Sequence, residues 1–354
     1  MTKIKENKHL IFIFLIFILS RLLFIFFIIK NKTSIFKIYD EVHYLKIAQY
    51  GYTDPELYAF FPFYPLLIRL LSYTGIPYNI SGIIISNIST ILSLIIIYKL
   101  CDKNKFETIT LFLLSPILAF TTLIYTESLY LFLTLFSFYL YKKNRYISSA
   151  IFTGLSTLTR NSGIILLGSI GLDMLYRLFK KKDIKISNII MFGLLSLMIG
   201  IIYPIFLYIN TGDFFKFITV QKQYWFRNSG YIILTLIKDI EFIINKFNVA
   251  QLYIFIQNWS MLFIGLILGI KLIKKDIVSS MYILGSLVGF TLTYRTIIIP
   301  TSGLFRYVLG LFPIYLYIFE LKTKNKYVNI LLVMVYIILA YCNAIIIYSN
   351  YFIA

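Results

Sequence analysis

The feature that most constrains this chain is a series of about eleven apolar runs, each near the ~20 residues that a helix needs to cross a membrane. Only 14% of its 354 residues are charged, whereas soluble domains carry about 25%. The sequence therefore predicts an all-α polytopic membrane protein, a helical bundle formed as one domain over residues 1–354. The runs are 10–29, 80–98, 107–124, 126–141, 146–160, 162–179, 187–208, 252–270, 277–293, 303–319 and 327–349.

The distribution of basic residues predicts the orientation of the chain. The net charge is +19, and the lysines and arginines gather in short loops on one side, as at Lys142 and Lys143. The positive-inside rule then places the N-terminus in the cytoplasm. The basic excess faces anionic membrane lipids rather than nucleic acid. No small-residue cleavage site separates residues 10–29 from Lys30, so we expect a retained anchor.

This topology leaves two long segments, 30–79 and 209–251, on the non-cytoplasmic side. The first is expected to hold a short helix over 40–46, a turn over 51–55 and an amphipathic stretch over 60–73 at the membrane interface. Long loops of this kind usually carry function. The functional site is therefore expected in the first of these segments.

Asp40, Glu41 and His43 concentrate acid–base groups at the start of this segment. Asp40 and His43 are three residues apart, so they share one face of a helix. A carboxylate there can accept a proton from an attacking hydroxyl, while His43 orients it or contacts phosphate. The alternative is that Asp40 only caps the helix.

Four arginines and one glutamate map to the outer ends of the runs or to the second long segment. Arg160, Arg295 and Arg306 lie at run ends, Arg227 lies in 209–251, and Glu127 lies between the third and fourth runs. Arginine grips phosphate through paired planar donors. Alternatively, each arginine reaches lipid headgroups, and Glu127 only begins a helix.

Several chemistries find no support in the sequence. It has no Walker loop, no dinucleotide glycine fingerprint and no His-Glu-x-x-His motif. Only two histidines occur, one of them His9 in the cytoplasmic tail, so a multi-histidine metal site is excluded. A carboxylate-bound Mg²⁺ or Mn²⁺ remains compatible with the sequence. Cys101 and Cys342 form neither a metal spacing nor a disulfide framework.

These motifs together resemble the PIG-V-like membrane mannosyltransferases, a family that includes the second mannosyltransferase of GPI-anchor assembly. Tyr39 departs from the usual tryptophan and Glu41 from the usual glycine, so the choice of base between Asp40 and Glu41 stays open. The matching residues are Asp40, His43 and Tyr44; Gly51-Tyr52; Ala59-Phe60-Phe61-Pro62 with Tyr64-Pro65; Tyr125 to Tyr130; Leu158 to Gly163; and Phe305-Arg306-Tyr307 with Phe312-Pro313.

The resemblance implies a GT-C fold and an inverting glycosyltransferase. Such an enzyme moves a sugar, here mannose, from a polyprenyl-phosphate carrier to a glycolipid or glycoprotein acceptor on the non-cytoplasmic face. The membrane would be the plasma membrane in a prokaryote and that of the ER in a eukaryote. The implied catalytic residues are Asp40, Glu41 and His43, and the implied substrate-binding residues are Phe61, Tyr64, Glu127, Arg160, Asn161, Arg227, Arg306 and Tyr307.

Two other functions fit the same composition. A flippase or transporter of lipid-linked sugars would place charges at mid-membrane in paired halves. Arg21 is the exception among runs that otherwise carry few central charges, while polar groups crowd one face. A non-catalytic subunit of a membrane glycosylation complex also remains open.

Overall fold

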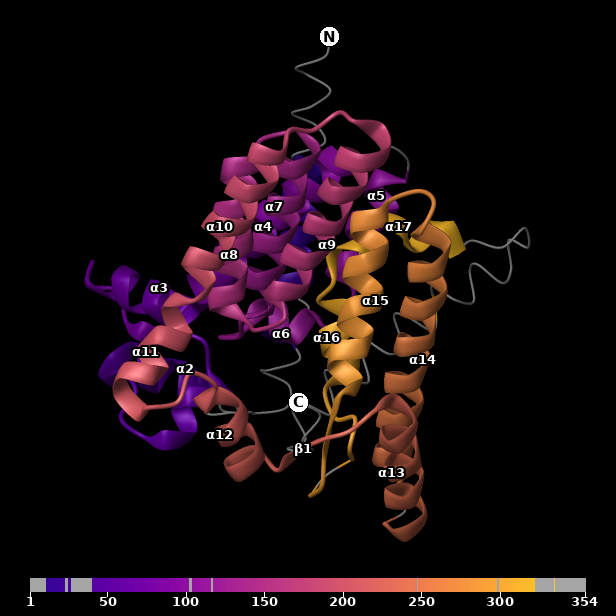
Figure 1. Cartoon of the computed structure of the whole chain (residues 1–354). Coiled ribbons are helices and arrows are strands. Elements are labelled where there is room, and N and C mark those ends of the chain that lie inside the picture. Colours follow the sequence, from indigo (N-terminus) through magenta and orange to yellow (C-terminus); the bar gives the residue numbers. More distant parts are fainter. Residues whose placement is uncertain are drawn as a thin grey trace.

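A computed structural model describes residues 11–22, 25–26, 40–101, 104–115, 117–246, 248–297, 299–321 and 334. The expected span 327–349 and part of the span 10–29 therefore lie outside the described residues, apart from a helix over Ile11–Leu22 and isolated positions. Within the described residues the fold consists of helices and one two-stranded ribbon (Figure 1).

The upper part of the molecule in Figure 1 is a helical bundle. Helix α7 packs between α4 and α8, and α8 packs against α10; α15 packs between α9 and α14. The bundle elements are α4 (Tyr78–Leu100), α5 (Lys105–Leu113), α6 (Leu118–Thr122), α7 (Glu127–Lys142), α8 (Tyr146–Thr159), α9 (Gly163–Tyr176), η2 (Arg177–Lys181), α10 (Ile186–Gly200), α11 (Ile202–Thr211), α14 (Val249–Leu272), α15 (Ile277–Thr291), α16 (Leu304–Leu309), α17 (Phe312–Tyr317) and η3 (Ile318–Leu321).

Three described helices are long and apolar enough to cross a membrane. They are α4 with 23 residues, the joined α10 and α11 with 26, and α14 with 24. The outward side of α10 carries exposed Ile190, Leu194 and Met198. A large apolar face of this kind suits contact with lipid. The predicted all-α membrane fold is confirmed.

Two expected spans are divided. The run 107–124 forms α5 and α6, and the run 303–319 forms α16 and α17. In the second case Pro313 occupies the first turn of α17. Proline lacks a backbone N–H and its fixed φ suits the first turn of a helix, so Pro313 favours the start of a new helix at this point.

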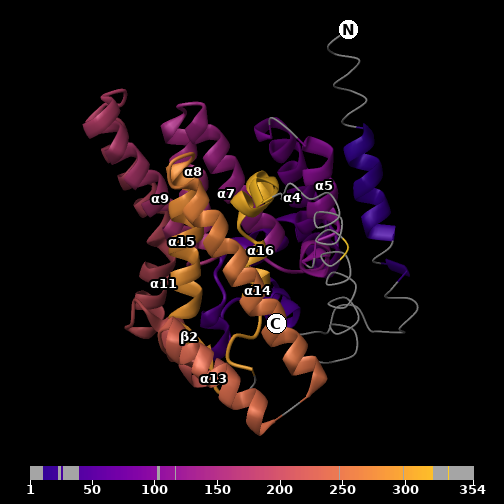
Figure 2. The ribbon, with the colours of Figure 1, turned by 90° about the vertical axis from the view of Figure 1, so that its right-hand side faces the viewer.

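The two long segments meet at the lower end of the bundle, as Figures 1 and 2 show. The helix expected from Asp40 is confirmed, although it extends to Tyr50, and Gly51 follows it with a φ of +80° that favours glycine. Helix α12 packs on η1, which joins the two segments. Their elements are α2 (Asp40–Tyr50), η1 (Pro55–Ala59), α3 (Phe63–Ser72), α12 (Lys216–Trp225), β1 (Arg227–Ser229) and α13 (Ile232–Asn245).

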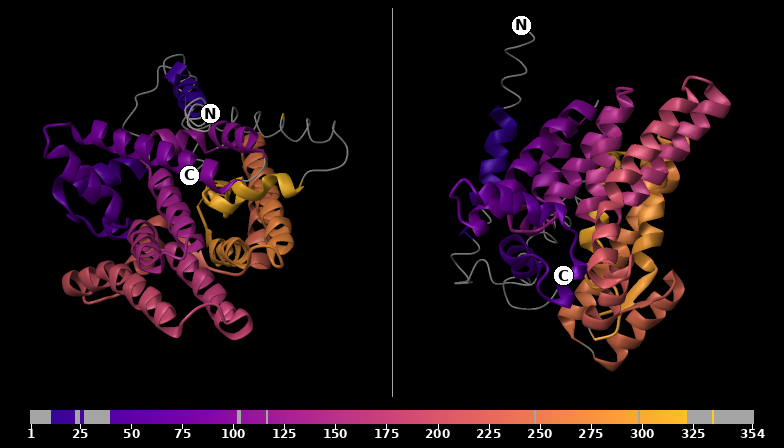
Figure 3. Two further views of the ribbon diagram at one scale, coloured as in Figure 1. Left: turned by 90° about the horizontal axis from the view of Figure 1, so that it is seen from above. Right: turned by 60° about the vertical axis from the view of Figure 1, so that its left-hand side comes forward.

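The ribbon pairs β1 with β2 (Thr293–Arg295), which follows α15. It therefore ties the second long segment to the stretch that leads into α16. Seen from above (Figure 3), α2 and α3 lie at the opposite edge of the molecule from α14 and α15. The site described next lies where α2, the start of α7, the end of α8, the ribbon and α16 come together.

Candidate active site

The two adjacent carboxylates of α2 point in different directions. The Asp40 side chain is 17% exposed, and its Oδ2 lies 3.3 Å from Nη2 of Arg306. Glu41 is 1% exposed, and its Oε1 accepts a hydrogen bond of 3.1 Å from the backbone N–H of Ile124. Successive residues of a helix are rotated by about 100°, which explains the divergence. Asp40 thus contacts a guanidinium group, and Glu41 contacts the backbone of Ile124.

Glu127, the first residue of α7, is a buried acid that contacts two arginines. It accepts a 2.8 Å hydrogen bond from Nη1 of Arg160, which directly follows α8. Its Oε1 also lies 2.9 Å from Nε of Arg306, an ion pair whose angles do not suit a hydrogen bond. One buried carboxylate thus holds two arginines that the chain places on α16 and at the end of α8.

Tyr307 lies at the centre of the arginines. The guanidinium carbons of Arg160, Arg306 and Arg227 lie 5.0, 5.2 and 5.7 Å from the centre of its ring. Distances of this size are typical of cation–π contacts. Nη2 of Arg227 also donates a 3.0 Å hydrogen bond to the Tyr307 hydroxyl. Tyr307 therefore connects the ribbon to α16.

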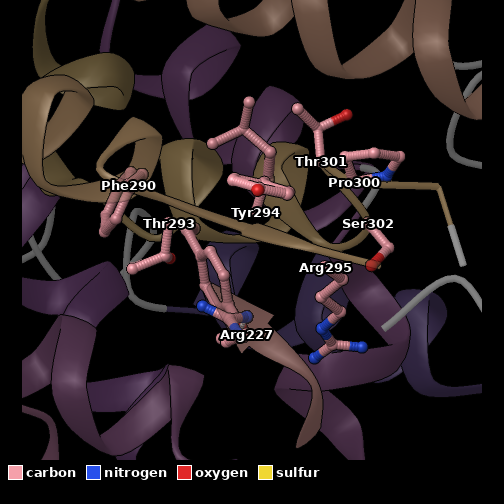
Figure 4. A pocket seen from close by; sticks show the side chains of 10 residues that line it. Arg227, Phe290, Thr293, Tyr294, Arg295, Pro300, Thr301 and Ser302 are labelled. Atoms are coloured by element: carbon pink, nitrogen blue, oxygen red, sulfur yellow. Dashed lines mark hydrogen bonds between the residues drawn. The ribbon is translucent and has the colours of Figure 1, made fainter. Parts of the chain in front are cut away.

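The ribbon brings a fourth arginine to this group. Arg227 of β1 is directly opposite Arg295 of β2, and both line a pocket that also contains Tyr307 and Ser302 (Figure 4). We call Arg160, Arg227, Arg295 and Arg306 the arginine cluster. The four guanidiniums lie beside two carboxylates, Asp40 and Glu127, so the group has an excess of two positive charges.

A buried hydrogen-bond network fixes the stretch before Arg306. The fully buried Asp239 of α13 accepts hydrogen bonds from the Trp259 indole (2.7 Å) and from the backbone N–H and hydroxyl of Thr301 (3.0 and 2.7 Å). Asn258 donates to the carbonyl of Thr301 and accepts from the N–H of Phe305. Burial raises the pKa of Asp239 to about 6, against the lowering effect of these hydrogen bonds.

His43 lies at the aromatic border of the site. Its ring stacks on Phe60 at 4.8 Å and meets Trp225 edge-on at 5.2 Å. Burial lowers the pKa of His43, and the nearby Asp40 opposes this effect. The imidazole is therefore neutral near pH 7, which favours a packing or hydrogen-bonding role over a charged one.

Three further residues singled out by the sequence contact other parts of the fold. Phe61 packs against Tyr203, with ring centres 4.8 Å apart. Tyr64 is completely buried, and its hydroxyl is 2.7 Å from that of Ser86. Asn161 is exposed in the connection between α8 and α9. The structure thus brings together Asp40, Glu127, Arg160, Arg227, Arg306 and Tyr307, with His43 at their edge.

The chain matches a family of known proteins over most of its length. The sequence pattern of the family described as Mannosyltransferase (PIG-V) matches residues 24–267, well over half of the chain. The chain belongs to the Mannosyltransferase (PIG-V) family. The matched residues of this PIG-V family chain include Asp40, Glu127, Arg160 and Arg227, whereas β2 and α16 lie beyond them.

Two relatives of this PIG-V family chain are the GPI alpha-1,6-mannosyltransferase 2 proteins of Cricetulus griseus and Rattus norvegicus. They are 26% and 25% identical over 146 residues, or 37% of this chain. The match covers only 30% of each relative. The shared region is therefore a minor part of those proteins.

The fold of the PIG-V family chain is similar to that of ArnT from Cupriavidus metallidurans, crystallised bound to undecaprenyl phosphate. The TM-score is 0.54 at 14% sequence identity, and the match covers 94% of this chain and 64% of ArnT. This similarity confirms the expected GT-C fold.

The positive charge of the site is supplied by guanidinium groups. In the part of the chain that the structure describes, no three histidine, cysteine, aspartate or glutamate side chains gather in a way that could hold a metal ion. Asp40 and Glu127 both face Arg306, and Glu41 accepts from a backbone amide. In this PIG-V family chain the carboxylates are thus arranged around arginine.

Proposed function

We propose that this chain is an inverting membrane glycosyltransferase. It moves a sugar, mannose, from a polyprenyl-phosphate carrier to a lipid-linked or protein-linked acceptor on the non-cytoplasmic face. The observation that carries the proposal is the contact between Asp40, a partly exposed carboxylate, and Arg306 in a cluster with an excess of positive charge. An inverting transfer needs both groups in one site.

The chemistry follows from these groups. The acceptor hydroxyl gives its proton to Asp40 while its oxygen forms a bond to the anomeric carbon of the sugar. The bond from that carbon to the phosphate oxygen breaks, and the polyprenyl phosphate leaves with the electron pair. Guanidinium groups stabilise the charge that develops on the phosphate. Attack opposite the leaving group inverts the anomeric configuration.

We assign the base to Asp40 rather than Glu41. Glu41 is buried behind Ile124 and already accepts its backbone N–H. Asp40 is exposed enough for a hydroxyl to reach it. Arg306 orients Asp40 toward the cluster through their 3.3 Å contact.

The carrier lipid would enter beside α3. An apolar cavity of about 350 Å³ is lined by Ile47, Tyr52, Pro62, Leu66 and Phe206, among others. Pro62 belongs to the Ala59–Pro65 motif, and the cavity lies between the first long segment and α11. An apolar lining of this size suits part of a polyprenyl chain. The names of the curated relatives support mannose, and undecaprenyl phosphate bound to ArnT supports a polyprenyl carrier.

Sugar transfer in membranes tests the proposal. Membranes that contain the wild type, Asp40→Asn or Glu41→Gln at equal expression would receive labelled polyprenyl-phosphomannose and a series of acceptor lipids. We expect transfer by the wild type and by Glu41→Gln, and a loss of about 10²-fold or more in Asp40→Asn. Equal transfer by all three proteins would remove Asp40 from the chemistry. No transfer by any of them would favour a transporter or subunit.

A further inference from the structure

The ribbon places two positive charges directly opposite each other. Arg227 and Arg295 are cross-strand partners in the antiparallel pair of β1 and β2. Such partners share one face of the ribbon, with Cβ atoms about 4.5–5.5 Å apart, and like charges there are destabilising. Figure 4 shows both guanidinium groups on the same side. An anion between the two guanidinium groups would relieve this repulsion, so the pair points to a bound anion.

The surroundings of the pair contain polar atoms without partners. Nε of Arg227 and the hydroxyl of Ser302 are buried and have no hydrogen-bond partner among the described residues. Arg227 and Ser302 line the same pocket as Arg295, Thr293 and Tyr307 (Figure 4). A buried donor without an acceptor costs free energy. An anion with several oxygen atoms would satisfy both of these groups.

The two halves of the arginine cluster differ in their partners. Arg160 and Arg306 are held by Glu127 and Asp40. Arg227 forms no ion pair with any described carboxylate; its donor contact is the Tyr307 hydroxyl. Burial, and then repulsion from Arg227, lower the pKa of Arg295 to about 10. Arg227 therefore keeps its positive charge without a described carboxylate partner.

We propose that Arg227 and Arg295, with Ser302 and Tyr307, bind the phosphate group of the lipid-linked sugar donor. Phosphate suits them because it offers several acceptor oxygens, and arginine binds it through paired donors. The donor phosphate is a diester with one negative charge, and breaking the bond to the sugar adds a second charge that two guanidinium groups can stabilise. The inference rests on the proposed function. It places the phosphate at the ribbon beside Tyr307, whose ring also contacts Arg306, the partner of Asp40.

This placement explains why two kinds of arginine are needed. Inversion requires the base and the leaving phosphate on opposite faces of the sugar. Arg306 and Arg160 then form ion pairs with the carboxylates, and Arg227 and Arg295 stabilise the leaving phosphate. A phosphate group on the acceptor is the alternative ligand for the two ribbon arginines.

Binding of undecaprenyl phosphate, which carries no sugar, tests the site without requiring transfer. The protein in lipid nanodiscs would be titrated as wild type, Arg227→Gln, Arg295→Gln and Lys222→Gln, the last being an exposed charge loss on the neighbouring α12. We expect at least a tenfold weaker affinity in both arginine variants and no change in Lys222→Gln. Competition by inorganic phosphate alone, at equal concentration, would show that a free phosphate rather than a lipid phosphate is recognised and would overturn the donor assignment.

The variant Arg227→Glu separates binding from folding. Opposite charges across the strands would keep or raise the melting temperature, whereas phosphate binding should disappear. A fall of the melting temperature together with unchanged binding would assign the pair to folding and overturn the proposal. Steady-state transfer by this variant adds a further readout. A raised KM for the donor with an unchanged KM for the acceptor supports the proposal. A raised KM for the acceptor with an unchanged KM for the donor contradicts it.

The proposed function and the ribbon site can fail separately. If the wild type transfers sugar but the affinity for undecaprenyl phosphate is the same in Arg227→Gln and Arg295→Gln, the ribbon assignment is wrong and the enzyme stands. If binding depends on both arginines while no transfer occurs with any acceptor, the phosphate site stands and the enzyme assignment fails. A wild type that does not bind the lipid phosphate contradicts both.

Discussion

Glu127 and Arg306 form a buried ion pair between the first residue of α7 and the middle of α16, with 2.9 Å between Oε1 and Nε. Arg160 joins the same carboxylate from the end of α8. The contact that holds these helix ends together is therefore also the contact that orients the cationic side of the site. Stability and site geometry should respond together when it is broken.

Replacement of Glu127 by glutamine tests that relationship. The variant leaves Arg160 and Arg306 buried next to a neutral amide, and removing one partner of a buried pair costs about 3–5 kcal/mol. We expect a clearly lower melting temperature in detergent and a loss of transfer. Glu107→Gln, an exposed carboxylate on α5, is the matched control and should change stability by less than about 0.5 kcal/mol. A melting temperature of Glu127→Gln equal to that of the control would contradict the ion-pair interpretation.

The role of His43 can be separated into packing and proton transfer. The ring stacks on Phe60, and its lowered pKa keeps it neutral near pH 7. An aromatic pair contributes about 0.5–1.5 kcal/mol to stability beyond its buried area, so His43→Ala should lower the free energy of unfolding by at least about this amount and should weaken transfer. His43→Phe should stay near the wild-type rate at pH 7 and should lose any wild-type decline that occurs at acidic pH. If both variants were equally inactive, a ring nitrogen would be required.

Asp239 makes stability depend on pH. Its pKa in the folded protein is raised to about 6 from an ordinary 3.8, so the folded state holds a proton that the unfolded state has lost. The contribution is complete below about pH 4 and is lost as the pH rises through about 6, amounting to about 3 kcal/mol for two units. We expect the unfolding free energy to fall over this window.

The control for this titration is Asp239→Asn, which should flatten the pH dependence between pH 4 and 6. Glu241→Gln removes a carboxylate from the exposed side of the same helix, α13, and should leave the slope as it is in the wild type. Identical slopes in the wild type and Asp239→Asn would show that other groups cause the dependence.

Replacing glycine by alanine is expected to have opposite effects on stability at two positions of α9. A Cβ at Gly163 would lie 2.5 Å from the backbone N of Thr157 and 2.6 Å from the backbone C of Ser156. Backbone atoms cannot yield easily, so Gly163→Ala should cost at least the ~1–3 kcal/mol typical of overpacking and should displace the neighbouring Arg160. Gly171→Ala meets no atom within 4 Å and should stabilise the helix by about 0.5–1 kcal/mol. Melting temperatures that move in the same direction would disprove this packing.

Local patterns were sufficient to find much of the site. Asp40 and His43 at helical spacing predicted the short helix that became α2. Arginines that interrupt or end apolar runs predicted polar groups at one end of the bundle, and Arg160 and Arg306 do meet there. The division of the run 303–319 also had a signal in Pro313, which the length of the run obscured.

Long-range pairing could not be predicted in the same way. The register of Arg227 with Arg295 depends on two short segments separated by α13, α14 and α15, and neither shows the alternation that marks a strand. Asp239 reads as an ordinary charge on an amphipathic helix, although its partners Trp259 and Thr301 come from distant elements. Only folding brings these partners together, so a single sequence taken by itself does not reveal the pairing.

The three consecutive residues 225–227 join the aromatic border of the site to the arginine cluster. Trp225 touches His43 and Phe60, Phe226 adopts a left-handed φ of 52°, and Arg227 binds Tyr307. This three-residue segment is too short and too strained to extend. A displacement of Trp225 at its aromatic end is therefore transmitted to Arg227 at its charged end. A molecule that moves His43 and one that binds Arg227 should then alter each other's affinity by the same factor, as reciprocal linkage requires. Ligands bound at the two ends of this segment would therefore be coupled through the backbone of a single residue, Phe226.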